Sequence, residues 1–172
     1  VVILRATQRV LRSLPQAAGE VAVSDNALGD WYVNRLVIDR RPLLLLVSSA
    51  SRLAIITPAR DVKGLPARLA QIVTDRLRRL GVSDVVIASE VEATTHVCVG
   101  KTVDRSVTGQ LVDFAKTLPF YLPVNGWDEA TLISAEDKLA ETPCRASRPD
   151  AEVIWPREAD IERLNATCPA SR

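Results

Sequence analysis

The order of apolar and polar positions predicts short strands and amphipathic helices along the first 118 residues. Five apolar runs have the length of strands: residues 1–4, 31–39, 43–47, 52–56 and 94–101. Four stretches have helical spacing: residues 7–14, 65–80, 84–92 and 106–118. The middle three strands follow one another through short turns, which predicts an antiparallel run. The unbroken LLLLV at 43–47 is typical of a central strand covered on both faces.

The helix at residues 65–80 has the clearest boundaries. Pro66 suits its first turn, and Gly81 suits the position after its last turn. Arg76 falls in the middle of the apolar stripe, where a buried guanidinium would need a carboxylate partner. We expect Arg76 instead to run along the edge of the stripe and to keep its charge in water.

Composition changes after Pro119. Six of the 10 prolines lie in the last 54 residues, together with most of the acidic charge. Residues 134–137 resemble a capping box, and Pro156 suits the start of a final helix. We therefore predict a core domain at residues 1–118 and a proline-rich, partly helical arm at 119–172 that packs on it. The predicted fold class is α+β, a mainly antiparallel sheet of four or five strands with helices packed on one face.

Total composition and cysteine usage predict a cytoplasmic globular protein. Apolar residues make up 47% and charged residues 25% of the chain, as in ordinary globular domains. No run approaches the roughly 18 apolar residues of a membrane span, and the first apolar run is too short for a signal peptide. Cys98, Cys144 and Cys168 form no CxxC pair and are odd in number, which indicates reduced thiols.

The net charge of +1 conceals two halves of opposite charge. Residues 1–82 contain 13 Lys and Arg against 6 Asp and Glu, a balance of +7, whereas residues 83–172 have a balance of −6. Two interpretations fit this pattern. The halves pack together and cancel, or the basic half faces an anionic partner.

Common catalytic motifs are missing from the sequence. It contains no GxGxxG, GxxxxGK[ST], GxSxG or HExxH, which counts against the common nucleotide-binding and hydrolase classes. His96 and Cys98 would share one strand face, but a nucleophile pair needs contact and an orienting group, so we expect an inert cysteine and an ordinary histidine. Cys144 and Cys168 lie at no standard zinc spacing from this pair. We therefore predict no metal and no cofactor.

The segment KTVDRSVTGQLVDF, residues 101–114, carries the most chemistry. A strand ends at Lys101 and a helix begins near Asp104, so free backbone N–H groups gather beside Lys101 and Arg105. These groups could bind an oxyanion, and Gly109 would allow close approach of a ligand or of another backbone. Asp104 is also a good N-cap, and a resident carboxylate would repel a phosphate. Capping is the simpler interpretation.

Four segments resemble a bacterial domain family of unknown function. They are RATQRVL at 5–11, LGDWYVN at 28–34, the hairpin at 40–47 and KTxxRSxxGxxxDF at 101–114. The resemblance spans residues 3–118 and, more loosely, LAETPC at 139–144. Val103 and Asp104 depart from the polar, Asn-like residues expected there, which weakens an anion site at this position. The resemblance implies where a site lies and implies no activity.

The leading functional hypothesis is binding of nucleic acid or another phosphate-bearing partner. Three groups would contribute: phosphate-binding cations, aromatic rings for stacking, and hydroxyls at the corner. The candidate residues are Arg5, Arg9, Arg12, Trp31, Tyr32, Lys101, Thr102, Arg105 and Ser106. In a helix, the first three arginines would share one side. The alternatives are a protein-interaction module of a two-gene bacterial system and an enzyme with a site near Asp30, Arg105 and Ser106.

Overall fold

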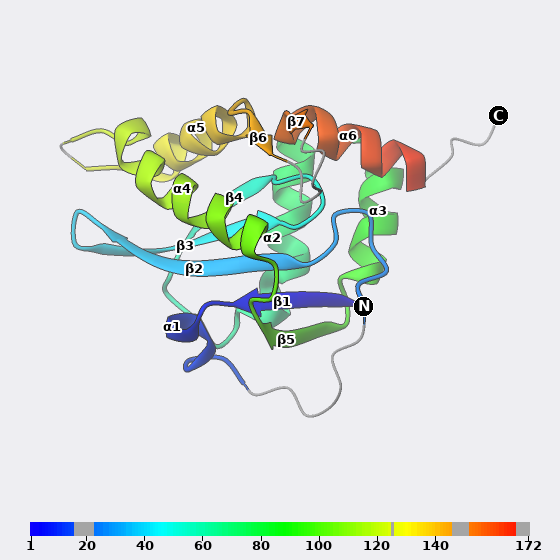
Figure 1. Ribbon diagram of the computed structural model, residues 1–172, viewed down its shortest axis with the longest axis horizontal. Coiled ribbons are helices and arrows are strands. Elements are labelled where there is room, and N and C mark those ends of the chain that lie inside the picture. The colour runs from blue at the N-terminus through cyan, green and yellow to red at the C-terminus, as the bar shows by residue number, and fades with distance from the viewer. Residues whose placement is uncertain (16–22, 125, 146–151, 168–172) are drawn as a thin grey trace.

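The structure is a computed structural model that describes residues 1–15, 23–124, 126–145 and 152–167 (Figure 1). Its main sheet contains β1 (Val2–Ala6), β2 (Trp31–Ile38), β3 (Arg41–Ser48), β4 (Ala54–Pro58) and β5 (Val97–Lys101). The helices are α1 (Gln8–Leu11), α2 (Leu65–Arg79), α3 (Asp84–Ala93), α4 (Arg105–Tyr121), α5 (Glu129–Ala140) and α6 (Pro156–Thr167). A small ribbon pairs β6 (Cys144–Arg145) with β7 (Val153–Ile154).

The main sheet is mixed, with the strand order β4-β3-β2-β1-β5. β2, β3 and β4 form the predicted antiparallel run. The turn between β2 and β3 places both Asp39 and Arg40 at positive φ, as a type I′ hairpin turn requires. β1 pairs in parallel with both β2 and β5. The predicted α+β class with a mainly antiparallel sheet of four or five strands is confirmed, with five strands, and the parallel pairing of β1 with its two neighbours is an addition.

Helices cover both faces of this sheet (Figure 1). Leu44 and Leu46 of β3 pack into a core with α2, whereas Leu43 and Leu45 pack into a second core with α4 and α5. All four leucines are fully buried, because successive strand residues point to opposite faces. The prediction that the helices pack on one face was wrong. The apolar stripe of a helix is the same whichever face it covers, so its spacing carries no information on this choice.

Both ends of α2 follow the sequence signals, but its arginine does not. Pro66 lies in the first turn, and Gly81 follows the helix at a φ of 81°. Arg76 is fully buried rather than extended into water. Its Nη1 lies 2.6 Å from Asp137 Oδ1, and its Nη2 donates to the carbonyl of Glu136 at 3.2 Å. The expected path along the stripe was wrong because α5 brings two carboxylates within reach.

Glu136 also closes part of the free edge of β4. Its Oε1 accepts from the amide of Ile56 at 2.7 Å, and its Oε2 accepts from Arg79 at 2.6 Å. Burial raises the pKa of Glu136, while the Ile56 amide and the charges of Arg76 and Arg79 oppose this rise. An edge strand otherwise presents unpaired N–H groups to other chains. One carboxylate thus joins the edge strand to helices from both faces of the sheet.

The C-terminal segment packs on both cores. α5 begins with a capping box in which Asp128 accepts from the amide of Thr131 and Thr131 accepts from that of Asp128. The box predicted at residues 134–137 was wrong, since these residues lie inside α5. The final helix at Pro156 is confirmed. Leu139 of α5 and Leu164 of α6 are buried in the two cores. Within the described ranges, no helix is long and apolar enough to cross a membrane.

Candidate functional site at the carboxyl ends of β1 and β5

β1 and β5 end side by side, and their chains then leave toward opposite faces of the sheet. Ala6 pairs with Lys101 at the last position of both strands. After β1, α1 contributes Val10 to the core that contains α2. After β5, α4 contributes Val107 to the other core. In open sheets, such a divergence between parallel neighbours leaves a crevice at their carboxyl ends, where ligands tend to bind.

Arg5 holds three of the chain segments at this end together. Its Nε lies 2.7 Å from Asp30 Oδ2, and its Nη1 donates to the carbonyl of Lys101 at 3.4 Å. The second oxygen of Asp30 accepts from Ser24 Oγ at 2.5 Å. The side chains of Arg5 and Asp30 are only 14% and 17% exposed. Arg5 therefore lies on a strand and not, as predicted, on one side of a helix with Arg9 and Arg12. Asp30 already balances its charge.

Gly100 makes room for this arginine. A Cβ at that position would lie 3.2 Å from Arg5 Nη1, closer than most side chains tolerate. Sequence reasoning missed Gly100, although a glycine inside a strand is a signal of close approach. At Gly109, no backbone of the described residues approaches closely, and the predicted approach of a ligand stays a prediction. A Cβ added at Gly109 would meet no described atom within 4 Å.

The corner between β5 and α4 is capped by its own aspartate. Asp104 Oδ1 accepts from the amides of Ser106 at 2.7 Å and Val107 at 3.3 Å. The amide of Asp104 donates to the hydroxyl of Tyr32 at 3.0 Å. These bonds match the capping interpretation, because the carboxylate occupies the positive end of the helix.

Arg52 lies beneath this corner and was not among the predicted residues. Its guanidinium is buried, with Nη2 donating to Ser106 Oγ at 3.3 Å and Nη1 to the carbonyl of Ser49 at 2.5 Å. Burial lowers the pKa of Arg52, and the nearby charge of Asp104 opposes this effect. Its backbone has a φ of 65°, which is rare outside glycine. The one sequence signal that could have pointed to Arg52 was a charged residue next to an apolar run.

Four exposed cations, here named the basic edge, lie on the segments around the carboxyl ends of β1 and β5. They are Arg9, Arg12, Lys101 and Arg105. α1 contacts β5, and Figure 1 shows α1 and the β5–α4 connection at the same end of β1. None of the four forms an ion pair with another residue of the described ranges. Thr102 is half-buried and Ser106 is exposed between them.

The two aromatic residues predicted as a stacking surface are buried. Trp31 is 0% exposed in the core that contains α2, and Tyr32 is 1% exposed in the core that contains α4. Neighbouring strand residues point to opposite faces, and both faces are covered by helices. Neither ring is accessible to a base, so this part of the predicted site was wrong.

Asp30, Arg105 and Ser106 do not form a catalytic cluster in the structure. Both oxygens of Asp30 are engaged by Arg5 and Ser24, and among the described residues it bonds to neither Arg105 nor Ser106. This enzyme hypothesis therefore has no supporting contact.

Two thiols and the single histidine lie within the described residues. His96 is exposed, with Nδ1 3.1 Å from Thr95 Oγ1, and Cys98 is half-buried. Burial raises the pKa of Cys144 to about 11, so its thiol stays protonated near neutrality. Cys168 lies outside the described residues. Within those residues, no group of three or more His, Cys, Asp and Glu side chains is placed to hold a metal ion.

None of the curated proteins compared with the chain matches it. A family model, described as a domain of unknown function (DUF6933), matches residues 3–159. This match includes β1, the β2–β3 hairpin and the β5–α4 corner, which carried the resemblance seen in the sequence, and it continues through α5 into α6. The chain therefore belongs to the DUF6933 family, a domain of unknown function.

Proposed function

We propose that the chain binds nucleic acid, or another partner with several phosphate groups, through the basic edge. The observation that carries the proposal is the gathering of Arg9, Arg12, Lys101 and Arg105 at the carboxyl ends of two parallel strands. All four side chains are exposed, and none is neutralised by a carboxylate within the described residues. Arginine and lysine on one edge are the usual phosphate contacts of nucleic-acid-binding proteins.

The buried aromatic residues define the kind of recognition that is proposed. Trp31 and Tyr32 offer no ring for base stacking, so the contact is with the phosphate backbone. Asp104 fills the amide positions at the start of α4, and Arg5 is balanced by Asp30. The exposed side chains therefore carry the interaction, and affinity should depend weakly on base sequence and strongly on salt.

Affinity for labelled RNA and DNA, single-stranded and duplex, tests the proposal at two salt concentrations. Four phosphate contacts predict a loss of about a hundredfold in affinity between roughly 50 and 200 mM salt. A variant with glutamine at all four positions of the basic edge should lose this salt-dependent binding. The measurement is fluorescence anisotropy with the full chain.

Glutamine at Lys116, Arg145, Arg157 and Arg163 is the matched control, because it also removes four charges and these exposed cations lie outside the basic edge, on α4, β6 and α6. This control should bind as the parent chain does. If the full chain at micromolar concentration showed no salt-dependent binding of RNA or DNA, the proposal would be contradicted. An equal loss in the control would show that only total charge matters and would also count against the basic edge.

A further inference from the structure

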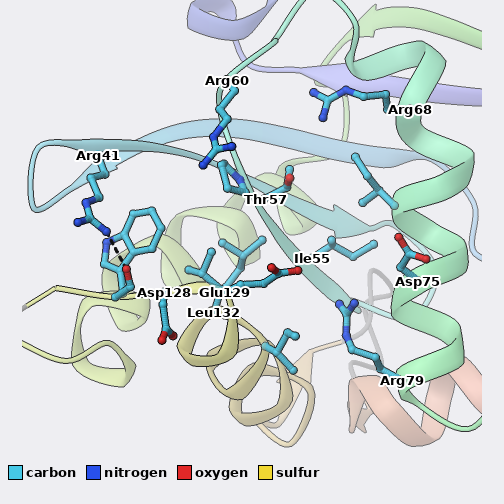
Figure 2. Close-up of a pocket in the computed structure, with 15 residues that line it drawn as sticks. Arg41, Ile55, Thr57, Arg60, Arg68, Asp75, Arg79, Asp128, Glu129 and Leu132 are labelled. Carbon is cyan, nitrogen blue, oxygen red and sulfur yellow. Dashed lines mark hydrogen bonds between the residues drawn. The ribbon is translucent and has the colours of Figure 1, made fainter.

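A cleft of about 550 Å³ opens at the free edge of β4, between α2 and the start of α5 (Figure 2). This volume lies in the range of small-molecule sites. Its apolar wall is supplied by residues of three elements. They are Ile55, Ile56, Ile72, Leu132 and Ile133. The cleft lies on the opposite edge of the sheet from β5, so it is separate from the basic edge.

Four arginines from three chain segments surround the polar side of the cleft. They are Arg41, Arg60, Arg68 and Arg79. Figure 2 shows the guanidinium groups of Arg60, Arg68 and Arg79 directed toward the space beside β4. Two of the four arginines are committed elsewhere. Arg79 pairs with Glu136, and Arg41 donates to the carbonyl of Trp127 at 2.7 Å while lying 5.1 Å over its ring.

Arg60 and Arg68 keep most of their donors for a ligand. Arg60 is exposed and makes no hydrogen bond or ion pair within the described residues. Arg68 Nη2 donates to the carbonyl of Asp61 at 2.6 Å, and further N–H groups of its guanidinium remain for a ligand. Two carboxylates of the lining are already engaged. Asp128 caps α5, and Asp75 accepts from Gln71 at 2.8 Å.

Two buried donors of the lining have no acceptor in the part of the chain that the structure describes. They are Nε of Arg68 and Nε1 of Trp127. These side chains come from α2 and from the residue before Asp128, on two sides of the cleft. Folded proteins rarely leave buried donors unpaired, so each such group calls for an explanation. An acceptor group supplied by a ligand is the explanation that matches the free cations nearby.

The edge of β4 is poorly suited to an added peptide strand. The outward amide of Ile56 already donates to Glu136. Pro58 faces the same way two residues later and has no N–H. A peptide that paired with this edge would find few donors, which favours a small molecule as the occupant.

We propose that this cleft binds a small amphiphilic anion, a molecule with one carboxylate or phosphate group and an apolar body. Arg60 and Arg68 bind the anionic group, while the apolar body lies on Ile55, Ile72 and Leu132. Glu129 at the opposite rim disfavours molecules with several negative charges. This ligand class and this site go beyond the proposed nucleic-acid binding.

Decanoate and phenyl phosphate test the proposal, one for each anionic group, with decan-1-ol as the uncharged counterpart. The protein used is the full chain with Trp155→Phe. The fluorescence of Trp127, which lines the cleft, then reports binding, whereas the fluorescence of the fully buried Trp31 should stay constant. We expect saturable binding of at least one anion by tryptophan fluorescence and by calorimetry. Arg60→Ala combined with Arg68→Ala should weaken it at least tenfold, and decan-1-ol should bind at least tenfold more weakly than decanoate.

Arg145→Ala combined with Arg157→Ala is the matched control, since both arginines are exposed and neither lines the cleft. Circular dichroism confirms that each variant is folded. No saturable binding of either anion, or equal binding by the Arg60/Arg68 variant and the control, overturns the proposal. Tighter binding of an acidic hexapeptide than of both small anions overturns it as well, because a strand would then be the occupant.

Discussion

Two buried carboxyl groups, Asp160 of α6 and Glu90 of α3, are the clearest residue-scale feature outside the candidate sites. Glu90 accepts from Asn26 Nδ2 at 2.6 Å and from the amide of Ala27 at 2.9 Å, and it thereby holds the loop before β2. Asp160 accepts only from Ser51 Oγ, at 3.0 Å, and its Oδ2 has no partner among the described residues. Burial raises the pKa of Asp160 to about 7, and the charge of Glu90 adds to this rise.

Stability should therefore fall as the pH rises from about 4 to about 7. The pKa of Asp160 exceeds its ordinary value of 3.8, so the folded state holds a proton that the unfolded state releases in this window. Asp160→Asn removes the titration and keeps an acceptor for Ser51. We expect this variant to raise the free energy of unfolding by about 1–3 kcal/mol at pH 8 and by much less at pH 4.

Urea unfolding of the parent chain, Asp160→Asn and the exposed control Asp113→Asn at pH 4, 6 and 8 checks this expectation. The control should show no comparable change with pH. A difference between Asp160→Asn and the parent chain that stays constant across all three pH values would contradict the role of Asp160.

At the scale of elements, the ends of helices are the features that local sequence determines. Asp104 caps α4, and the cap forms among residues that are neighbours in the chain. We expect Asp104→Ala to lower the free energy of unfolding by about 0.5–2 kcal/mol, because two amides of the first turn lose their acceptor. Asp104→Ser should retain most of the stability, since serine is also a good N-cap. Thermal and urea unfolding measure the stability of both variants. An equal loss of stability in Asp104→Ala and Asp104→Ser would show that the N-cap hydrogen bonds do not stabilise α4.

Contacts between distant elements were beyond local sequence signals. Arg76 meets Glu136 and Asp137, which lie about 60 residues later in the segment predicted as an arm. Nothing near Arg76 in the sequence specifies these partners, so its burial was missed. Trp31 and Tyr32 were misplaced for a related reason. Their burial depends on helices that cover both faces of the sheet, and a strand's own pattern does not reveal what covers it.

Only part of the candidate site was predicted, because local sequence does not reveal contacts between distant elements. Lys101 and Arg105 were found because a strand end and a helix start lie within a few residues of each other. The Arg5–Asp30 pair was only one of many possible charge pairs until β1 and β2 were placed side by side. Gly100 acquires its role only once Arg5 lies across the parallel pairing of β1 with β5. The cleft at β4 is lined by residues of β3, β4, α2 and α5, and no spacing in the sequence indicates it.

At the scale of the whole molecule, the C-terminal segment completes both cores. Leu132 and Leu139 are buried on the α4 side of the sheet, and Leu164 is buried on the α2 side. Burying three leucines contributes about 5–9 kcal/mol, which is comparable to the total stability of a small domain. The boundary predicted at residue 118 thus separates two segments that share their packing.

A chain that ends at residue 124 should therefore fail to fold cooperatively. It loses the three leucines and also Glu136, the acceptor for the edge amide of β4. Urea unfolding followed by circular dichroism should show no sharp transition, whereas a chain that ends at residue 167 should behave as the full chain does. A cooperative transition in the shorter chain would show that residues 1–118 are a domain in their own right.

The closure of the β4 edge by Glu136 also has a consequence for the newly made chain. Glu136 follows its partner Ile56 by 80 residues. At a synthesis rate of about 5–20 residues per second, β4 is complete roughly 4–16 s before its closing carboxylate is made. During that interval the growing chain carries an open strand edge and uncovered leucines. The molecule is therefore most prone to pair with other chains while it is still on the ribosome, and least prone once α5 has docked.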